Sequence, residues 1–142
     1  MRRGMTLALA VLLALPAVAL AARRVIHGPA GAGSGTVDIT LVTKNGAVKK
    51  LTRFEFNNIQ ATCKGSSTTV TAVSDQFPHT IKVASDGSFA AKVKVNGGRV
   101  TYRVSGHFKN QNSASGKLRV KGTVPGCGNA DTGTVHWSAK HN

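Results

Sequence analysis

The chain has 142 residues, enough to bury one hydrophobic core and too few for two large ones. Lysine and arginine number 19 against five acidic residues, a formal net charge of +14 at pH 7, so polyanions are the expected partners. The few carboxylates and the five scattered histidines match no common catalytic arrangement, and we expect a protein that is not an enzyme and holds no cofactor.

The N-terminus has the pattern of a secretory signal peptide. Two arginines near the start precede an unbroken apolar stretch over residues 7–15, then a proline, then small residues at 19 and 21. Cleavage after Ala21 would remove residues 1–21 and leave a secreted protein, free or associated with the cell envelope, with no transmembrane span. The alternative is an uncleaved membrane anchor, because residues 5–22 are almost long enough to span a bilayer.

A flexible leader is expected after the cleavage site. Residues 22–35 show no apolar period and end in a run rich in glycine and alanine. A single β domain is therefore expected over residues 36–142.

Two cysteines, Cys63 and Cys127, remain after cleavage, and an even pair in an exported chain is first interpreted as a disulfide. Closing so long a loop stabilises a domain by about 4 kcal/mol in the chain-entropy model. Neither cysteine has a second cysteine or a histidine at zinc-ligand spacing, so no metal site is expected there. A reactive thiol is the remaining alternative.

Beyond residue 36, apolar residues recur at every second position, which is typical of half-buried strands, and no helical period stands out. The first run ends at Asn45-Gly46, a strong hairpin signal. The second, over residues 48–63, changes register around Asn57-Asn58, which predicts a bulge. Two short strands are expected over residues 70–73 and 80–83.

The C-terminal half predicts an antiparallel meander of four strands. Gly106 and Gly122 occupy inward positions within two of these strands, and a glycine inside a strand often marks a bend. About eight strands with matching bends would close into a small barrel, and a two-sheet β-sandwich is the alternative.

The order of motifs in this half is also familiar. The chain carries Tyr102-Arg103-Val104-Ser105-Gly106-His107-Phe108, then Cys127, and ends in Gly133-Thr134-Val135-His136-Trp137-Ser138-Ala139-Lys140. It resembles a group of small exported β-domain proteins from actinobacteria. The resemblance implies export and a shared fold, and it implies no activity.

The positive residues of these strands fall on the parity opposite to the apolar ones, which predicts a basic outer sheet face. A hairpin at Gly97-Gly98 would set Lys92 opposite Arg103, and like charges in such a pair destabilise a sheet. An anionic cell-wall polymer, a lipid headgroup layer or extracellular nucleic acid would relieve this repulsion; the alternative is a face that only keeps the protein soluble. The predicted binding residues are Lys92, Lys94, Arg99, Arg103, Lys117, Arg119 and Lys121.

Specific nucleic-acid recognition is not expected, because the aromatic residues share the parity of the core and offer no stacking platform. A second hypothesis is a carrier with an interior ligand site near Tyr102 and Trp137. His107 and His136 could bind a metal weakly if their strands were neighbours, although ordinary surface histidines are the simpler interpretation.

Overall fold

The computed structural model describes residues 20–64 and 70–142, so the predicted signal peptide lies almost wholly outside the described residues. Within these ranges there is no helix long and apolar enough to cross a membrane. The described chain forms ten strands: β1 (Ala22–Pro29), β2 (Thr36–Lys44), β3 (Ala47–Cys63), β4 (Val70–Gln76), β5 (Ile81–Lys82), β6 (Ser88–Val95), β7 (Val100–Asn110), β8 (Ser113–Val124), β9 (Gly128–Asp131) and β10 (Val135–Lys140).

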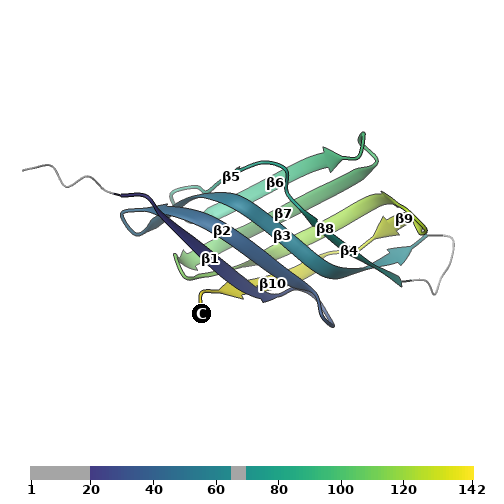
Figure 1. Ribbon diagram of the computed structural model, residues 1–142, viewed down its shortest axis with the longest axis horizontal. Helices are drawn as coiled ribbons and strands as arrows, with labels where there is room; N and C mark the ends of the chain where they lie inside the picture. Colours follow the sequence, from purple (N-terminus) through teal and green to yellow (C-terminus); the bar gives the residue numbers. More distant parts are fainter. Residues whose placement is uncertain (1–19, 65–69) are drawn as a thin grey trace, which may run out of the picture.

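The strands form two layers that cross one another (Figure 1). One layer contains β1, β2, β3 and β4, paired antiparallel in chain order. The other contains the antiparallel meander β6, β7 and β8, followed by β10, which pairs with β8. Alternate side chains of both layers point inward, and together they make one core.

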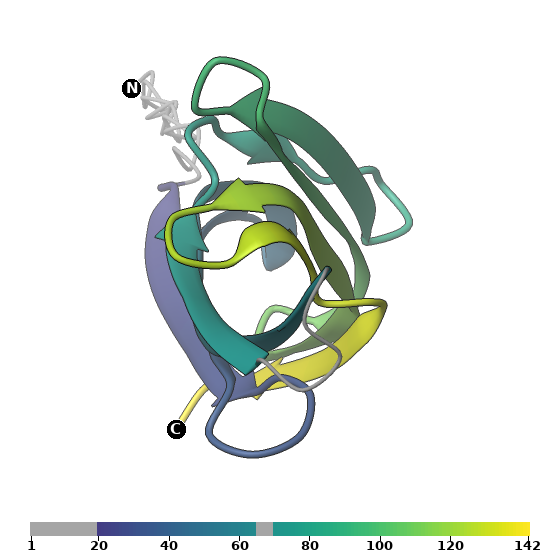
Figure 2. The same cartoon turned by 90° about the vertical axis from the view of Figure 1, so that its right-hand side faces the viewer.

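Hydrogen-bonded neighbours form a ring. β10 joins the two layers by pairing with β8 and with β1, and β9 joins them again by pairing with β8 and with β3. Figure 2 looks at the strands from one end and shows them arranged around a common axis. The predicted all-β antiparallel fold is confirmed, with ten strands instead of about eight.

The expectation of a flexible leader over residues 22–35 is wrong. Residues 22–29 form β1, which pairs with β2 along its whole length. The inward positions are Ile26, Gly28 and Ala30, and two of these are too small to give an apolar signal in the sequence. A Cβ on Gly28 would lie 1.9 Å from the carbonyl oxygen of Ser138, so only glycine lets β1 approach β10 this closely. The folded domain therefore begins at Ala22 and not at Thr36.

The predicted bulge in the long strand β3 is confirmed. The β3–β4 register shifts between Phe56 and Ile59, and Asn58 between them adopts a positive φ of 54°. Its backbone N–H bonds to the hydroxyl of Ser74, 2.9 Å away. The shift keeps both Phe56 and Ile59 in the core, although they are an odd number of residues apart.

Gly106 makes room for an aromatic ring. It lies opposite Gly116 on β8, and Trp137 lies opposite Gly116 on β10. A Cβ on Gly106 would come within 2.8 Å of the Trp137 ring and 2.7 Å of the Phe89 ring. The sequence signal of a bend at this glycine therefore marks a packing position for two buried rings.

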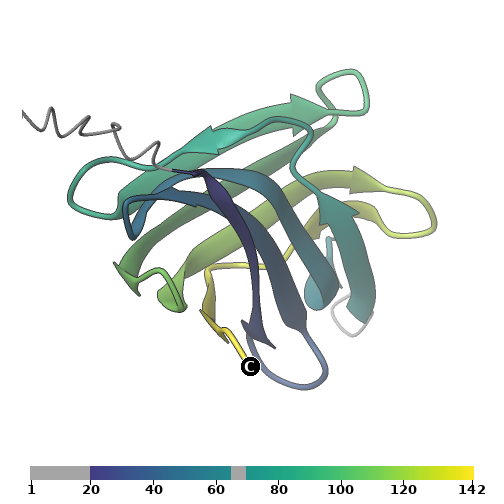
Figure 3. The same ribbon diagram turned by 60° about the vertical axis from the view of Figure 1, so that its left-hand side comes forward.

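The predicted disulfide is confirmed. Cys63 at the end of β3 is bonded to Cys127 in the turn between β8 and β9, with a Cα–Cα distance of 5.2 Å. Next to it, the last residue of β3 pairs with Ala130 of β9. The bond therefore fastens the β8–β9 hairpin to β3 where β9 joins the two layers. Figure 3 shows this hairpin and the β6–β7 turn projecting from the same end of the molecule.

Candidate anion-binding face

Three cations stand in one row across three neighbouring strands. Lys92 of β6 pairs with Arg103 of β7, and Arg103 pairs with Arg119 of β8. All three side chains are exposed on the outer side of the sheet. The register predicted from the Gly97-Gly98 turn is correct, because Val95 pairs with Val100 and Lys92 with Arg103.

The core fixes this outward placement. The residues between the cations on β7 and β8 are Tyr102, Val104, Leu118 and Val120, and each is at most 4% exposed. Since successive side chains of a strand point to opposite faces, burying this set forces the cations between them outward. We call the outward cations of these strands the basic face: Lys92, Lys94, Arg103, Lys117, Arg119 and Lys121.

The basic face is hollowed in two places. A narrow depression of about 200 Å³ is lined only by outward residues and the backbone between them: Lys92, Thr101, Arg103, Arg119 and Lys121. A wider one of about 570 Å³ shares the row of three cations and adds Lys117 at its rim. Its floor contains small or uncharged residues: Ala90, Ala91, Val104, Ser105, Leu118 and Thr134. The row therefore forms a wall common to both depressions.

One carboxylate reaches the face. Asp131 of β9 accepts two hydrogen bonds from Arg119, Nε to Oδ1 at 3.0 Å and Nη2 to Oδ2 at 2.7 Å. These bonds, with a backbone N–H from Gly133 and the nearby charge of Lys121, lower the pKa of Asp131 to about 2 despite partial burial. Arg119 is thereby held in a fixed orientation and half neutralised.

The other acids lie elsewhere. Asp38 and Glu55 are on the β1–β3 layer, where they pair with His27 and Arg53. Asp86 accepts bonds from Ser88 in the turn before β6. Among the described residues, no ion pair within 4.0 Å involves the other five cations of the basic face. Their charge is therefore open to an external anion.

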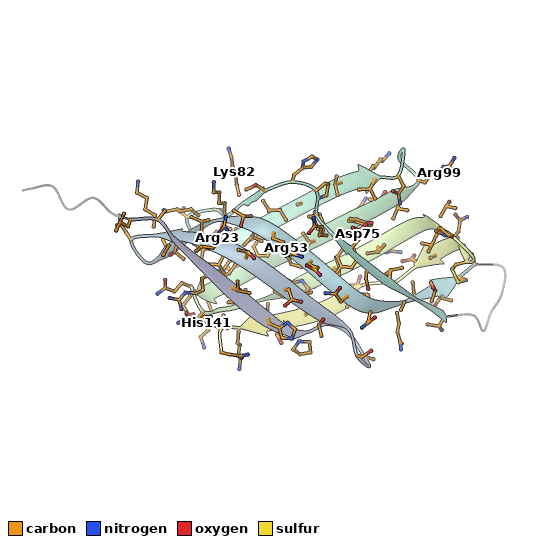
Figure 4. All side chains as sticks on the ribbon, in the orientation of Figure 1. Arg23, Arg53, Asp75, Lys82, Arg99 and His141 are labelled. Atoms are coloured by element: carbon orange, nitrogen blue, oxygen red, sulfur yellow. A yellow bond between two sulfur atoms is a disulfide. The ribbon has the colours of Figure 1, made fainter. Side chains whose placement is uncertain are left out.

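Arg99 does not lie in the depressions. It lies in the turn at residues 96–99, and Figure 4 shows it at the end of the molecule. Lys94 lies on the outer face, next to Thr101, but lines neither depression. Other cations labelled in Figure 4, Arg23 and Arg53, lie on the opposite layer.

The two histidines considered as metal ligands do not meet. His107 is on β7 and His136 on β10, and β8 lies between these strands. His107 also donates from Nε2 to the backbone carbonyl of Asp86, 2.8 Å away. Among the described residues, no group of three or more potential ligands could hold a metal ion.

Tyr102 and Trp137 are not assembled into one interior site. Their rings are the two ends of a series in which Phe77 and Phe54 lie between them, with successive ring centroids 5.5–5.8 Å apart. A cavity of about 210 Å³ reaches Tyr102 from the side of β4, and Trp137 does not line it. The Tyr102 hydroxyl donates to Asp75 at the edge of this cavity, and burial followed by this bond raises the tyrosine pKa.

Several residues of the face were not predicted as site residues. Thr101 and Ser105 contribute hydroxyl groups, and the correct β6–β7 register would have placed them opposite Lys94 and Ala90. Asp131 gave no such signal, because its approach to Arg119 depends on the β8–β9 pairing across an irregular turn.

Comparison with protein-family models, with curated proteins and with solved structures gave no significant match to this chain. The resemblance to small exported actinobacterial proteins therefore remains a prediction. What the protein does must be argued from the geometry of the basic face.

Proposed function

We propose that this protein is an exported, non-enzymatic module that binds anionic polymers of the cell envelope through its basic face. One observation carries the proposal: Lys92, Arg103 and Arg119 lie side by side across three strands. Opposite-charge and mixed pairs are what stabilise a sheet surface, whereas like charges placed directly opposite destabilise it. An anionic polymer lying on the face would remove this repulsion on binding.

Solubility alone is a weaker explanation of the arrangement. A soluble surface needs charges of both signs, interspersed, and does not need cations in contact with one another. Here the cations converge on two depressions, and the one nearby carboxylate orients a cation at the edge. Convergent cations around a concave surface raise the local concentration of anions.

The disulfide supports export. The bond between Cys63 and Cys127 requires oxidising conditions to form and persist, and such bonds are typical of exported proteins. Together with the signal-peptide pattern at the N-terminus, it favours a location outside the cell membrane, either free or bound to the envelope.

The experiment measures retention of residues 22–142 on immobilised anionic polymer across a salt gradient. The test variant combines Lys92→Glu, Arg103→Glu and Lys117→Glu. The control combines Arg23→Glu, Lys49→Glu and Lys82→Glu, which are also exposed but lie off the basic face. Both variants have the same net charge, so any difference between them reports position.

We expect the face variant to elute at much lower salt and to lose about 0.7 units of salt slope for each lost phosphate contact. The control should elute close to the wild type. Equal weakening of the two variants would contradict the proposal, because net charge alone would then explain retention.

A further inference from the structure

The two depressions of the basic face differ in chemistry. In the narrow one, Lys92, Arg103, Arg119 and Lys121 surround the hydroxyl of Thr101, and no carboxylate lines it. A phosphate presents oxygens in several directions and can accept from several such donors at once. A carboxylate is planar, and one guanidinium fork satisfies both of its oxygens. The narrow depression therefore favours a tetrahedral anion.

The wide depression is suited to an uncharged group. Its floor carries a methyl group from Ala90 and a hydroxyl from Ser105, which lie opposite one another on β6 and β7. Its charged side chains stand at the rim, and three of them also border the narrow depression. A ligand that fills both depressions would place a charged group beside a larger neutral one.

Nucleic acid fits this surface poorly. Single strands bind where exposed aromatic rings interleave with cations. Here all seven aromatic residues are buried, the most exposed being Phe89 at 6%. The face offers donors for phosphates and no platform for bases.

A lipid surface also fits poorly. Membrane-surface binding combines cations with apolar side chains that enter the headgroup region. The exposed large apolar residues of the described chain are Leu20, Val25 and Val70, and none of these lies on β6, β7 or β8. The basic face therefore lacks the insertion that would accompany anionic headgroups.

We infer that the ligand of the basic face is a soluble linear polymer of polyol units joined by phosphodiesters. A phosphate occupies the narrow depression, and the adjoining uncharged polyol occupies the wide one. This inference rests on the proposed function and specifies its ligand. Arg103 and Lys92 contact the phosphate from the wall that the two depressions share.

The first test compares polymers at one salt concentration by calorimetric titration: poly(glycerol phosphate), poly-α-glutamate of equal charge, oligothymidylate and vesicles containing phosphatidylglycerol. Poly(glycerol phosphate) should bind about tenfold more tightly than polyglutamate, the margin expected when a site is built to hydrogen-bond one chemical group. Equal binding of polyglutamate, or tighter binding of oligothymidylate or vesicles, would overturn the inference.

The second test separates the depressions without changing charge. Ser105→Leu should fill the wide depression and weaken binding of poly(glycerol phosphate) by about tenfold, while pyrophosphate, which needs only the narrow one, should bind unchanged. Ser115→Leu is the matched control, because Ser115 is exposed on the neighbouring strand outside both depressions. A parallel loss for both ligands, or no loss for the polymer, would overturn the two-depression arrangement.

The two proposals fail differently. If polyglutamate binds as well as poly(glycerol phosphate) and both depend on Lys92, Arg103 and Lys117, the face is a polyanion site and only its ligand has been misassigned. If the charge-reversed face variant binds every polymer as the wild type does, the proposed function itself is wrong.

Discussion

Arg103 stands directly opposite Arg119 in the β7–β8 ladder, and Asp131 binds only the second of the two. The guanidinium of Arg103 therefore has cations on both sides, since Lys92 lies opposite it on β6. A sheet would be more stable with an acid at this position. The binding function and the folding stability of this residue are thus opposed.

Replacing Arg103 by glutamate should stabilise the fold while abolishing polymer binding. Arg103→Glu converts two repulsive cross-strand pairs into attractive ones, worth about 0.5–1 kcal/mol in the free energy of unfolding. Urea denaturation measures this change, with Lys109→Glu as a control at an exposed β7 position outside the row. A destabilised Arg103→Glu variant would show that the row is not under electrostatic stress.

The Asp131–Arg119 pair should make stability sensitive to acid. Its pKa of about 2 lies below the ordinary value of 3.8, so the pair's stabilisation is present above about pH 4 and is lost as the pH falls towards 2. Thermal unfolding of wild type and Asp131→Asn should differ at pH 6 and converge near pH 2. The difference should be small, because solvent screens this surface pair. A constant difference across this range would contradict the assignment.

The same substitution has an opposite effect on binding. Asp131→Asn releases Arg119 and removes a negative charge from the edge of the basic face. Retention on anionic polymer should therefore rise to higher salt at neutral pH. Lower retention would indicate that orientation of Arg119 by Asp131 matters more than its free charge.

Tyr102 should resist ionisation in the folded protein. Burial first, and then its hydrogen bond to Asp75, raise its pKa above the ordinary value of 10.0. Because the folded-state pKa is raised, the resulting stabilisation is present below about pH 10 and is lost at higher pH. Absorbance at alkaline pH follows this titration directly, since the chain has one tyrosine. Tyr102→Phe should lose less stability between neutral and alkaline pH than the wild type.

Gly106→Ala should destabilise the core by about 1–3 kcal/mol, as overpacking does. Its new methyl group would meet only side-chain atoms, from the rings of Phe89 and Trp137. Adding Phe89→Leu should therefore recover part of the loss, and the fluorescence of the single tryptophan follows unfolding in both variants. If the double variant is as unstable as the sum of the two single ones, the proposed contact does not cause the loss.

Removing the disulfide should lower the free energy of unfolding by about 4 kcal/mol, because the bond closes a long loop. The double variant Cys63→Ala with Cys127→Ala and the chemically reduced wild type should agree in urea titrations. An unchanged midpoint in both would mean that the β3–β9 pairing holds this end of the molecule without the bond.

Much of the architecture could be predicted because the C-terminal strands alternate cleanly and a glycine pair sets the register of Lys92 against Arg103. The pairing of Cys63 with Cys127 followed from their number. β1 was missed because Gly28 and Ala30 are buried without contributing hydrophobicity. Such a strand is specified by the close approach of its neighbours, which a local pattern does not contain.

Asp131 and the depressions could not be predicted for a related reason. Asp131 meets Arg119 only through the pairing of β9 with β8 across the turn that contains Cys127. The depressions depend on which small side chains, such as Ala90 and Ser105, fall between the cations of three strands. Both are products of tertiary register and not of sequence spacing.

The ring has a consequence for how the molecule is made. β1 is among the first parts of the chain to leave the ribosome, yet its outer edge is covered by the last strand, through His27 beside Lys140, Ala30 beside Trp137, and a bond from His141 to the Val25 carbonyl. A nascent chain can form the early hairpins but must keep this edge open until its final residues arrive. Ribosome-bound or C-terminally truncated chains will therefore present a strand edge that is ready to pair with another copy.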